Sequence, residues 1–337
     1  MLIDVHGHVS APADLYAYKS NLLAHRGAHG RGGVKLSDDQ LHEALQAPNP
    51  SFGNISHLDH LEEAGIDLQL ISPRPYQQMH SESPVKLVEW FTEETNNIIA
   101  RHCELYPDTF RGVAGIPQSP HVGPENCLKE LERAITELGF VGCLLNSDPA
   151  EGEGPTPPGL GDRYWYPLYE KLCELDVPAL LHSAGCRSPR EPYSLHFIIE
   201  ETISVIHILG SNVFEDFPDL KLIISHGGGA VPYQLGRFQA GRHRRGAERF
   251  EESLRRMYFD TCLYTRDALE LLFRTVGTDR ALFGSEKPGT GSVKNPDNGR
   301  WMDDIKPLID EIDWLTDDDR QRIFTDNASE LFLLDRT

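Results

Sequence analysis

The chain has 337 residues, of which 39% are hydrophobic, and its 32 basic and 52 acidic side chains give a formal net charge of −20. Such a charge repels nucleic-acid phosphates and anionic lipid heads, so we expect neither a nucleic-acid nor a membrane partner. No apolar run approaches the roughly 20 residues of a membrane-spanning helix. The six scattered cysteines form no C-x-x-C pair, which indicates reduced thiols and a cytoplasmic protein.

Eight short apolar, β-branched runs alternate with longer helical patterns along the chain. The runs cover residues 2–8, 66–73, 110–117, 141–147, 177–182, 221–228, 257–262 and 281–286. The helical patterns cover residues 57–64, 84–106, 126–138, 166–175, 195–209, 267–276, 303–312, 317–324 and 328–333. Buried strands alternating with helices predict a parallel sheet, and eight such units predict a (β/α)8 barrel of the TIM type. The competing doubly wound sheet would carry G-x-G-x-x-G after its first strand, where this sequence has His6-Gly7-His8.

We expect one domain over residues 1–337, with insertions at the C-terminal face of the barrel. Residues 19–50 are polar and rich in Gly and His, and residues 151–163 form a loop rich in Pro and Gly. A shorter loop covers residues 188–193. All three follow predicted strand ends, at the face where barrel active sites lie, and long loops there often act as lids.

Histidine and carboxylate side chains collect at the predicted C-terminal ends of the strands. His6 and His8 point the same way, because residues i and i+2 of a strand share a face. His182 ends the fifth strand and Glu286 the eighth. A lone H-x-H pair is weak evidence, but the four residues together predict a metal site. Three imidazoles and one carboxylate suit Zn²⁺, with Mn²⁺ or Fe²⁺ as alternatives.

Further candidates lie at the same predicted face. His226 precedes three glycines and would either ligate the metal or hold a water or substrate oxygen beside it, and we favour the second role. Arg74, between two prolines, suits bidentate binding of a substrate carboxylate, although a surface arginine packed on a loop is the plain alternative. The remaining candidates for substrate binding are Lys287 and Asn146, and two more cations, Arg187 and Arg190, are expected near the mouth.

Several motifs resemble the amidohydrolase superfamily, in the branch that contains metal-dependent decarboxylases and the 4-oxalomesaconate hydratases. They are LISPRP (70–75), WFTEETNN (90–97), WYPLYE (165–170), SHGGGAVPY (225–233), FDTC (259–262) and FGSEKP (283–288). The decarboxylases carry aspartate at the eighth strand, whereas glutamate at this position, here Glu286, is typical of the hydratases. The resemblance implies a zinc ion held by His6, His8, His182 and Glu286.

The resemblance implies hydration of an activated C=C bond in an unsaturated oxo-di- or tricarboxylic acid of aromatic-acid catabolism. Glu286 would accept a proton, His226 would position water, and Arg74 would anchor a carboxylate. The hydratases carry a tyrosine where this sequence has Phe197, so His196 or Tyr193 would protonate carbon.

Alternatives to hydration stay open: a decarboxylase, a lactone or amide hydrolase, or a metal- or ligand-binding barrel without catalytic activity. The partner is a small carboxylic acid in each catalytic case. The resemblance also implies a homo-oligomer.

Overall fold

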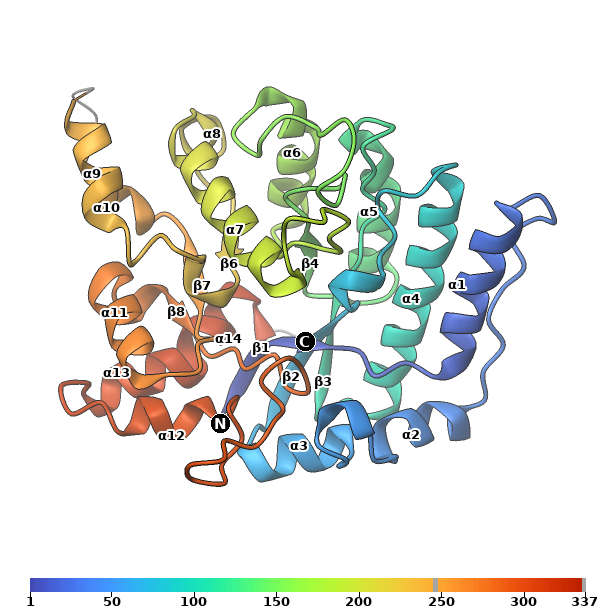
Figure 1. The fold of residues 1–337 in the computed structure, drawn as a ribbon, viewed down its shortest axis with the longest axis horizontal. Helices are drawn as coiled ribbons and strands as arrows, with labels where there is room; N and C mark the ends of the chain where they lie inside the picture. The colour runs from blue at the N-terminus through green and yellow to red at the C-terminus, as the bar shows by residue number, and fades with distance from the viewer. Residues whose placement is uncertain (245–247, 335–337) are drawn as a thin grey trace.

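The computed structural model describes residues 1–244 and 248–334 and forms an eight-stranded parallel barrel (Figure 1). The strands follow one another in chain order and pair in parallel from β1 to β8. They are β1 (Ile3–His8), β2 (Leu68–Ser72), β3 (Phe110–Ala114), β4 (Gly142–Leu145), β5 (Ala179–Leu181), β6 (Leu222–Ile224), β7 (Tyr258–Asp260) and β8 (Ala281–Leu282). All eight predicted strands are present, and the predicted barrel is confirmed.

Two backbone hydrogen bonds join the last strand region to the first. The Val5 N–H donates to the Phe283 carbonyl at 2.9 Å, and the Glu286 N–H donates to the His6 carbonyl at 2.7 Å. The later strands are shorter than predicted, because the chain leaves the sheet early. For example, β6 ends at Ile224, whereas the apolar run continues to residue 228. The predicted strand ends are therefore loops at the barrel mouth.

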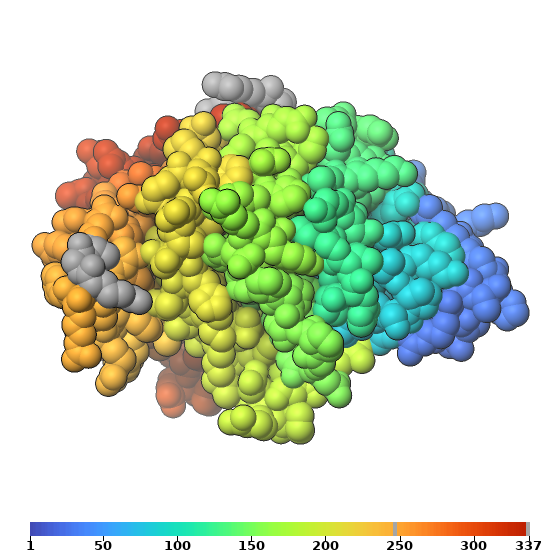
Figure 2. Space-filling view, turned by 90° about the horizontal axis from the view of Figure 1, so that it is seen from above, coloured from blue at the N-terminus to red at the C-terminus, as the bar shows by residue number. Residues whose placement is uncertain are grey.

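Helices surround the strands, as the fan of ribbons in Figure 1 shows. They are α1 (Ala13–His25), α2 (Asp38–Gln46), α3 (His57–Ala64), α4 (Lys86–Leu105), α5 (Leu128–Thr136), α6 (Tyr166–Leu175), α7 (Tyr193–Leu209), α8 (Val213–Asp216), α9 (Leu235–His243), α10 (Phe250–Leu254), α11 (Arg266–Val276), α12 (Ile305–Asp310), α13 (Asp317–Gln321) and α14 (Asn327–Leu331). In the space-filling view the colours follow chain order across the surface, as expected when each unit lies beside the next (Figure 2). Within the described residues no helix is both long and apolar enough to cross a membrane, and all six cysteines are free.

The segment 19–50 differs from the loop that we expected. Its start completes α1, and residues 38–46 form α2, whose capping box joins Ser37 to Gln40. Leu41 and Leu45 are fully buried on α2, so apolar residues four apart in an otherwise polar stretch were enough to form a helix. The segment thus contributes helices to the outer layer. Residues 151–162 do form an irregular loop, as expected.

The barrel interior is filled by apolar side chains and closed by the C-terminal helix. Val5, Leu70, Leu144 and Ile223 belong to a cluster that also includes Leu331 of α14. Side chains from separate strands therefore meet a helix that follows the last strand. The core below the mouth is tightly packed and leaves the polar chemistry to the strand ends.

We predict that Leu331→Ala destabilises the protein by about 2–5 kcal/mol, because it removes a buried side chain from this cluster. Leu271 of α11 is 38% exposed, so Leu271→Ala is the matched control and should cost less than about 1 kcal/mol. Urea unfolding followed by fluorescence measures both. Equal losses for the two variants would show that α14 does not close the core.

Candidate metal centre and active site

Four histidines from three segments meet at the C-terminal mouth of the barrel. His6 and His8 lie on β1, His182 directly follows β5, and His226 lies two residues after β6. The ring centroid of His6 is 5.1 Å from that of His8, 5.0 Å from that of His182 and 5.3 Å from that of His226. All four side chains are buried. The structure therefore brings together every histidine that we predicted at the metal.

Each imidazole is held through Nδ1. His6 Nδ1 is 2.7 Å from Asp260, His8 Nδ1 is 2.8 Å from the Ser72 hydroxyl, and His182 Nδ1 donates to the Ser183 carbonyl at 2.7 Å. The Nε2 atoms of these three histidines are buried and have no hydrogen-bond partner. A buried nitrogen without a partner is costly, and this pattern, Nδ1 occupied and Nε2 free, is that of metal-ligating histidine.

Electrostatics favour the neutral form of the central rings. Burial, followed by the charges of neighbouring histidines, lowers the pKa of His8 and His182 well below the ordinary value. For His226, burial also lowers the pKa, but the buried Glu201 carboxylate, 2.7 Å from Nδ1, outweighs it and raises the pKa to about 10. The neutral rings of His8 and His182 can therefore offer lone pairs at Nε2, whereas the Glu201 carboxylate favours the charged form of His226.

Glu286 completes the cluster. Ligand atoms of His6, His182, His226 and Glu286 all lie within 4.8 Å of one another, and the Glu286 carboxylate lies 3.8 Å from His8 Nε2. This set includes His226 where we predicted His8. Both His226 and Glu286 have left-handed backbone, with φ of 49° and 61°, a conformation that few non-glycine residues adopt.

A β-bulge on β1 explains how two histidines reach the mouth. The β1–β2 register shifts between Asp4 and Gly7, so Val5 packs in the barrel core while the chain that follows turns His6 and His8 toward the mouth. Asp4 is left outside the cluster. Its carboxylate accepts hydrogen bonds from the Ser285 N–H at 2.9 Å and the Ser285 hydroxyl at 2.7 Å, which fastens the loop that carries Glu286.

A cavity of about 220 Å³ opens beside His226 and Glu286. Its lining residues combine apolar walls with a polar floor: Ser194, Phe197, Ile198, His226, Cys262, Leu263, Tyr264, Glu286 and Thr290. The Phe197 ring stacks on His226, 5.9 Å away with an interplanar angle of 3°. Phe197 therefore offers this cavity a flat apolar face and no proton.

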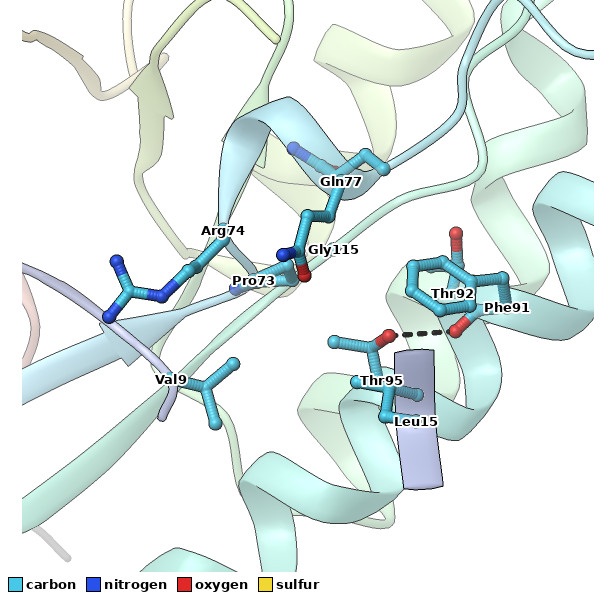
Figure 3. Close-up of a pocket in the computed structure, with 10 residues that line it drawn as sticks. Val9, Leu15, Pro73, Arg74, Gln77, Phe91, Thr92, Thr95 and Gly115 are labelled. Carbon is cyan, nitrogen blue, oxygen red and sulfur yellow. Dashed lines mark hydrogen bonds between the residues drawn. The ribbon is translucent and has the colours of Figure 1, made fainter. Parts of the chain in front are cut away.

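Arg74 lies just after β2 and is 6% exposed. Its Nη1 donates to the Pro288 carbonyl at 3.3 Å, its guanidinium lies 4.7 Å from the centre of the Phe52 ring, and its Nη2 is buried without a partner. Figure 3 shows the guanidinium pointing away from Phe91 and Thr95. The void between Arg74 and the side chains of Phe91 and Thr95 measures about 10 Å³, which is no larger than a water, so a carboxylate does not fit there. The part of the guanidinium that can bind a carboxylate is therefore the unpaired Nη2.

Three of the other predicted residues have partners within the protein, and a fourth, Arg190, points to solvent. Lys287 is fully buried and forms an ion pair with Asp303 at 2.7 Å, so it is not presented to substrate. Asn146 bonds His80 at 2.9 Å and the Asp148 carbonyl at 3.1 Å, and it shapes the loop after β4. Arg187 bridges Glu82 and Glu151 at the rim, and Arg190 is exposed. Their positions after the predicted strands placed these residues on the C-terminal side of the barrel. The spacing in the sequence could not show which side chains they contact.

Neither predicted proton donor is itself a lining residue of the cavity. His196 Nδ1 is 2.8 Å from Glu191, and its buried Nε2 lies 3.9 Å from Asp148. The Tyr193 ring packs against Phe197 at 4.2 Å and Tyr76 at 5.9 Å. Burial and the charge of Glu286 raise the pKa of the Tyr193 phenol. Tyr193 thus packs behind Phe197 of the cavity wall, and His196 faces Glu191 and Asp148.

Sequence reasoning missed three residues that touch the cluster: Asp260, Glu201 and Tyr264. The FDTC motif (259–262) contains Asp260, so the sequence did offer a signal for this residue. Glu201 lies on a buried stripe of α7 with Phe197 and Val205, and a carboxylate on an apolar stripe at four-residue spacing indicates a buried partner. The Tyr264 hydroxyl donates to Glu286 at 3.1 Å, and burial with neighbouring charges raises its pKa.

The fold and this cluster are those of the barrel enzymes that work at a metal centre. The Amidohydrolase family matches residues 3–334, and the chain belongs to that family. It is 36% identical to a 2-keto-4-carboxy-3-hexenedioate hydratase from Sphingobium sp., over 98% of this chain and 96% of the relative.

Solved structures agree with this assignment. A 4-oxalomesaconate hydratase from Rhodopseudomonas palustris is 34% identical, with a TM-score of 0.88 over 100% of this chain and 97% of that one. A manganese-bound dihydroxybenzoic acid decarboxylase from Polaromonas sp. shares the fold, with 22% identity and a TM-score of 0.73 over 100% and 98% of the two chains. The protein is an enzyme of the amidohydrolase superfamily, homologous to hydratases.

We predict that Asp260→Asn weakens metal binding about 10–100-fold, because the carboxylate that orients His6 is lost. Competition with a chromophoric chelator, followed by metal analysis, measures the affinity. His182→Ala should lose the metal entirely, and His102→Gln, a buried histidine of α4 outside the cluster, should keep it. Unchanged affinity in Asp260→Asn would remove Asp260 from the site.

Proposed function

We propose that this enzyme adds water across the activated C=C bond of an unsaturated oxo-di- or tricarboxylic acid, with 4-oxalomesaconate as the first candidate. The full-length similarity to two hydratases, at 36% and 34% identity, carries the proposal. We further propose that it works as a cytoplasmic homo-oligomer in aromatic-acid catabolism.

The site residues fit a divalent cation. The unpartnered Nε2 atoms of His6, His8 and His182, with the Glu286 carboxylate beside them, form the donor set that we propose as ligands. Nitrogen-rich donors favour Zn²⁺, with Mn²⁺ or Fe²⁺ as alternatives, and the Polaromonas decarboxylase binds manganese. When bound, such an ion acts as a Lewis acid and lowers the pKa of water.

The chain's own residues supply the remaining steps. Arg74, through its free Nη2, would hold a substrate carboxylate and fix the pose. Glu286 would accept a proton from the attacking water, since its carboxylate faces both the histidines and the cavity. His226, anchored by Glu201, would orient that water.

Decarboxylation and hydrolysis of a lactone or amide are the competing reactions. The decarboxylases that the sequence resembles carry aspartate at the position of Glu286, and the decarboxylase structure is only 22% identical. The reactions differ in whether CO₂ is released and whether the conjugated double bond is lost.

We predict that the metal-loaded protein removes the conjugated absorbance of 4-oxalomesaconate without releasing CO₂, and that mass spectrometry shows a product heavier by one water. Spectrophotometry and a coupled CO₂ assay follow the two events. CO₂ release would establish the decarboxylase instead. Absence of turnover in metal-loaded protein would rule out this substrate.

We predict that Glu286→Gln folds normally but lowers turnover by about 10²–10⁴-fold, because the amide cannot accept the proton of water. Turnover is measured at equal metal occupancy, and Glu170→Gln, at an exposed position of α6, is the control. Turnover close to wild type in metal-loaded Glu286→Gln would exclude Glu286 as the base.

A further inference from the structure

The proposed hydration needs a residue that donates a proton to the substrate carbon. The residues that line the cavity are the candidates for this role. Phe197 has no acidic proton, and His226 is committed to Glu201. The Cys262 thiol lies 3.6 Å from the Tyr264 hydroxyl and 3.7 Å from the Ser285 carbonyl, and its Sγ is 3.9 Å from Glu286. The hydroxyls of Ser194 and Thr290 are far weaker acids than a phenol. Tyr264 combines a phenol proton with a hydrogen bond to Glu286 at 3.1 Å, which is shorter than the 3.9 Å contact of Cys262.

Tyr264 is also connected to the proposed base. Its hydroxyl donates to one Glu286 oxygen at 3.1 Å, while the other Glu286 oxygen faces His8 Nε2 at 3.8 Å. One carboxylate therefore touches the histidine cluster on one side and the phenol on the other. A proton that arrives at Glu286 has a direct path to Tyr264.

We propose that Tyr264 is a catalytic residue, which protonates the substrate carbon and is reprotonated by Glu286. This inference rests on the proposed hydratase function. It does not depend on Tyr193 or His196, which lie outside the cavity lining.

The proposed step balances in atoms and electrons. The water oxygen forms the new C–O bond, and one water proton passes to Glu286. The π electrons of the C=C bond move toward the conjugated carbonyl and form an enolate. The enolate carbon takes the phenol proton of Tyr264, and the resulting phenolate takes the proton from Glu286. The substrate has gained one water, and both residues have returned to their starting states.

The test is Tyr264→Phe, measured at equal metal occupancy. We expect kcat to fall about 10²–10⁴-fold, with unchanged KM, metal content and melting temperature. The matched control is Tyr164→Phe, which loses a phenol bonded to the Val122 carbonyl and should keep wild-type kcat.

A second readout separates proton donation from mere positioning of Glu286. In the reverse reaction, the hydrated product carrying deuterium at the carbon to be deprotonated should show a larger isotope effect with Tyr264→Phe than with wild type, because transfer of that proton becomes rate-limiting. If Tyr264 only positioned Glu286, the C–O step would slow instead, and the isotope effect would fall or stay constant.

The outcomes distinguish the two proposals. If wild-type protein adds no water, both are overturned. If wild type hydrates and Tyr264→Phe retains kcat, or if Tyr193→Phe alone loses kcat and raises the isotope effect, only the assignment to Tyr264 is overturned.

Discussion

The close packing of buried imidazoles at the barrel mouth governs the rest of the site. The ring centroids of His6, His182 and His226 lie 4.9 to 5.3 Å apart, and the His8 ring lies 5.1 Å from His6 and 5.4 Å from His182. Buried rings at this separation cannot all carry charge, because each protonated ring would raise the electrostatic energy of its neighbours. Hydrogen bonds at every Nδ1 fix the orientation of the rings, so the free Nε2 atoms of His6, His8 and His182 are left without a protein partner. An arrangement with so many unsatisfied nitrogens is understandable as a binding site and hard to explain as a core.

Regular strand pairing is interrupted at the positions from which the histidines and Glu286 reach the site. The bulge on β1 separates Val5 of the core from His6 of the site, and β6 and β8 end early so that His226 and Glu286 can adopt left-handed backbone. Such conformations persist only when surrounding contacts determine them. Asp4 provides some of these contacts, because its carboxylate accepts hydrogen bonds from the backbone N–H and the hydroxyl of Ser285, next to Glu286.

The cavity combines two environments that suit a conjugated, negatively charged substrate. Phe197, Ile198 and Leu263 form apolar walls, whereas His226, Tyr264 and Glu286 form a hydrogen-bonding floor. A chain with a net charge of −20 repels polyanions at long range, and the buried, partly unpaired guanidinium of Arg74 supplies a local positive charge near the mouth. Lys287 and Arg187, the other cations predicted for substrate binding and for the mouth, are already paired with Asp303, Glu82 and Glu151.

The barrel and the residues at its mouth could be read from local patterns in the chain, because burial periods and strand-end positions are local properties. His6, His8, His182, His226, Glu286 and Arg74 could all be predicted in this way. Which of the candidates are free to act depends instead on contacts between distant segments: Lys287 and Asn146 are engaged by Asp303 and His80, and Tyr264 contacts Glu286. These pairings join residues from 16 to 66 positions apart. Periodicity does not encode such contacts, because they depend on how separate loops fold over one another.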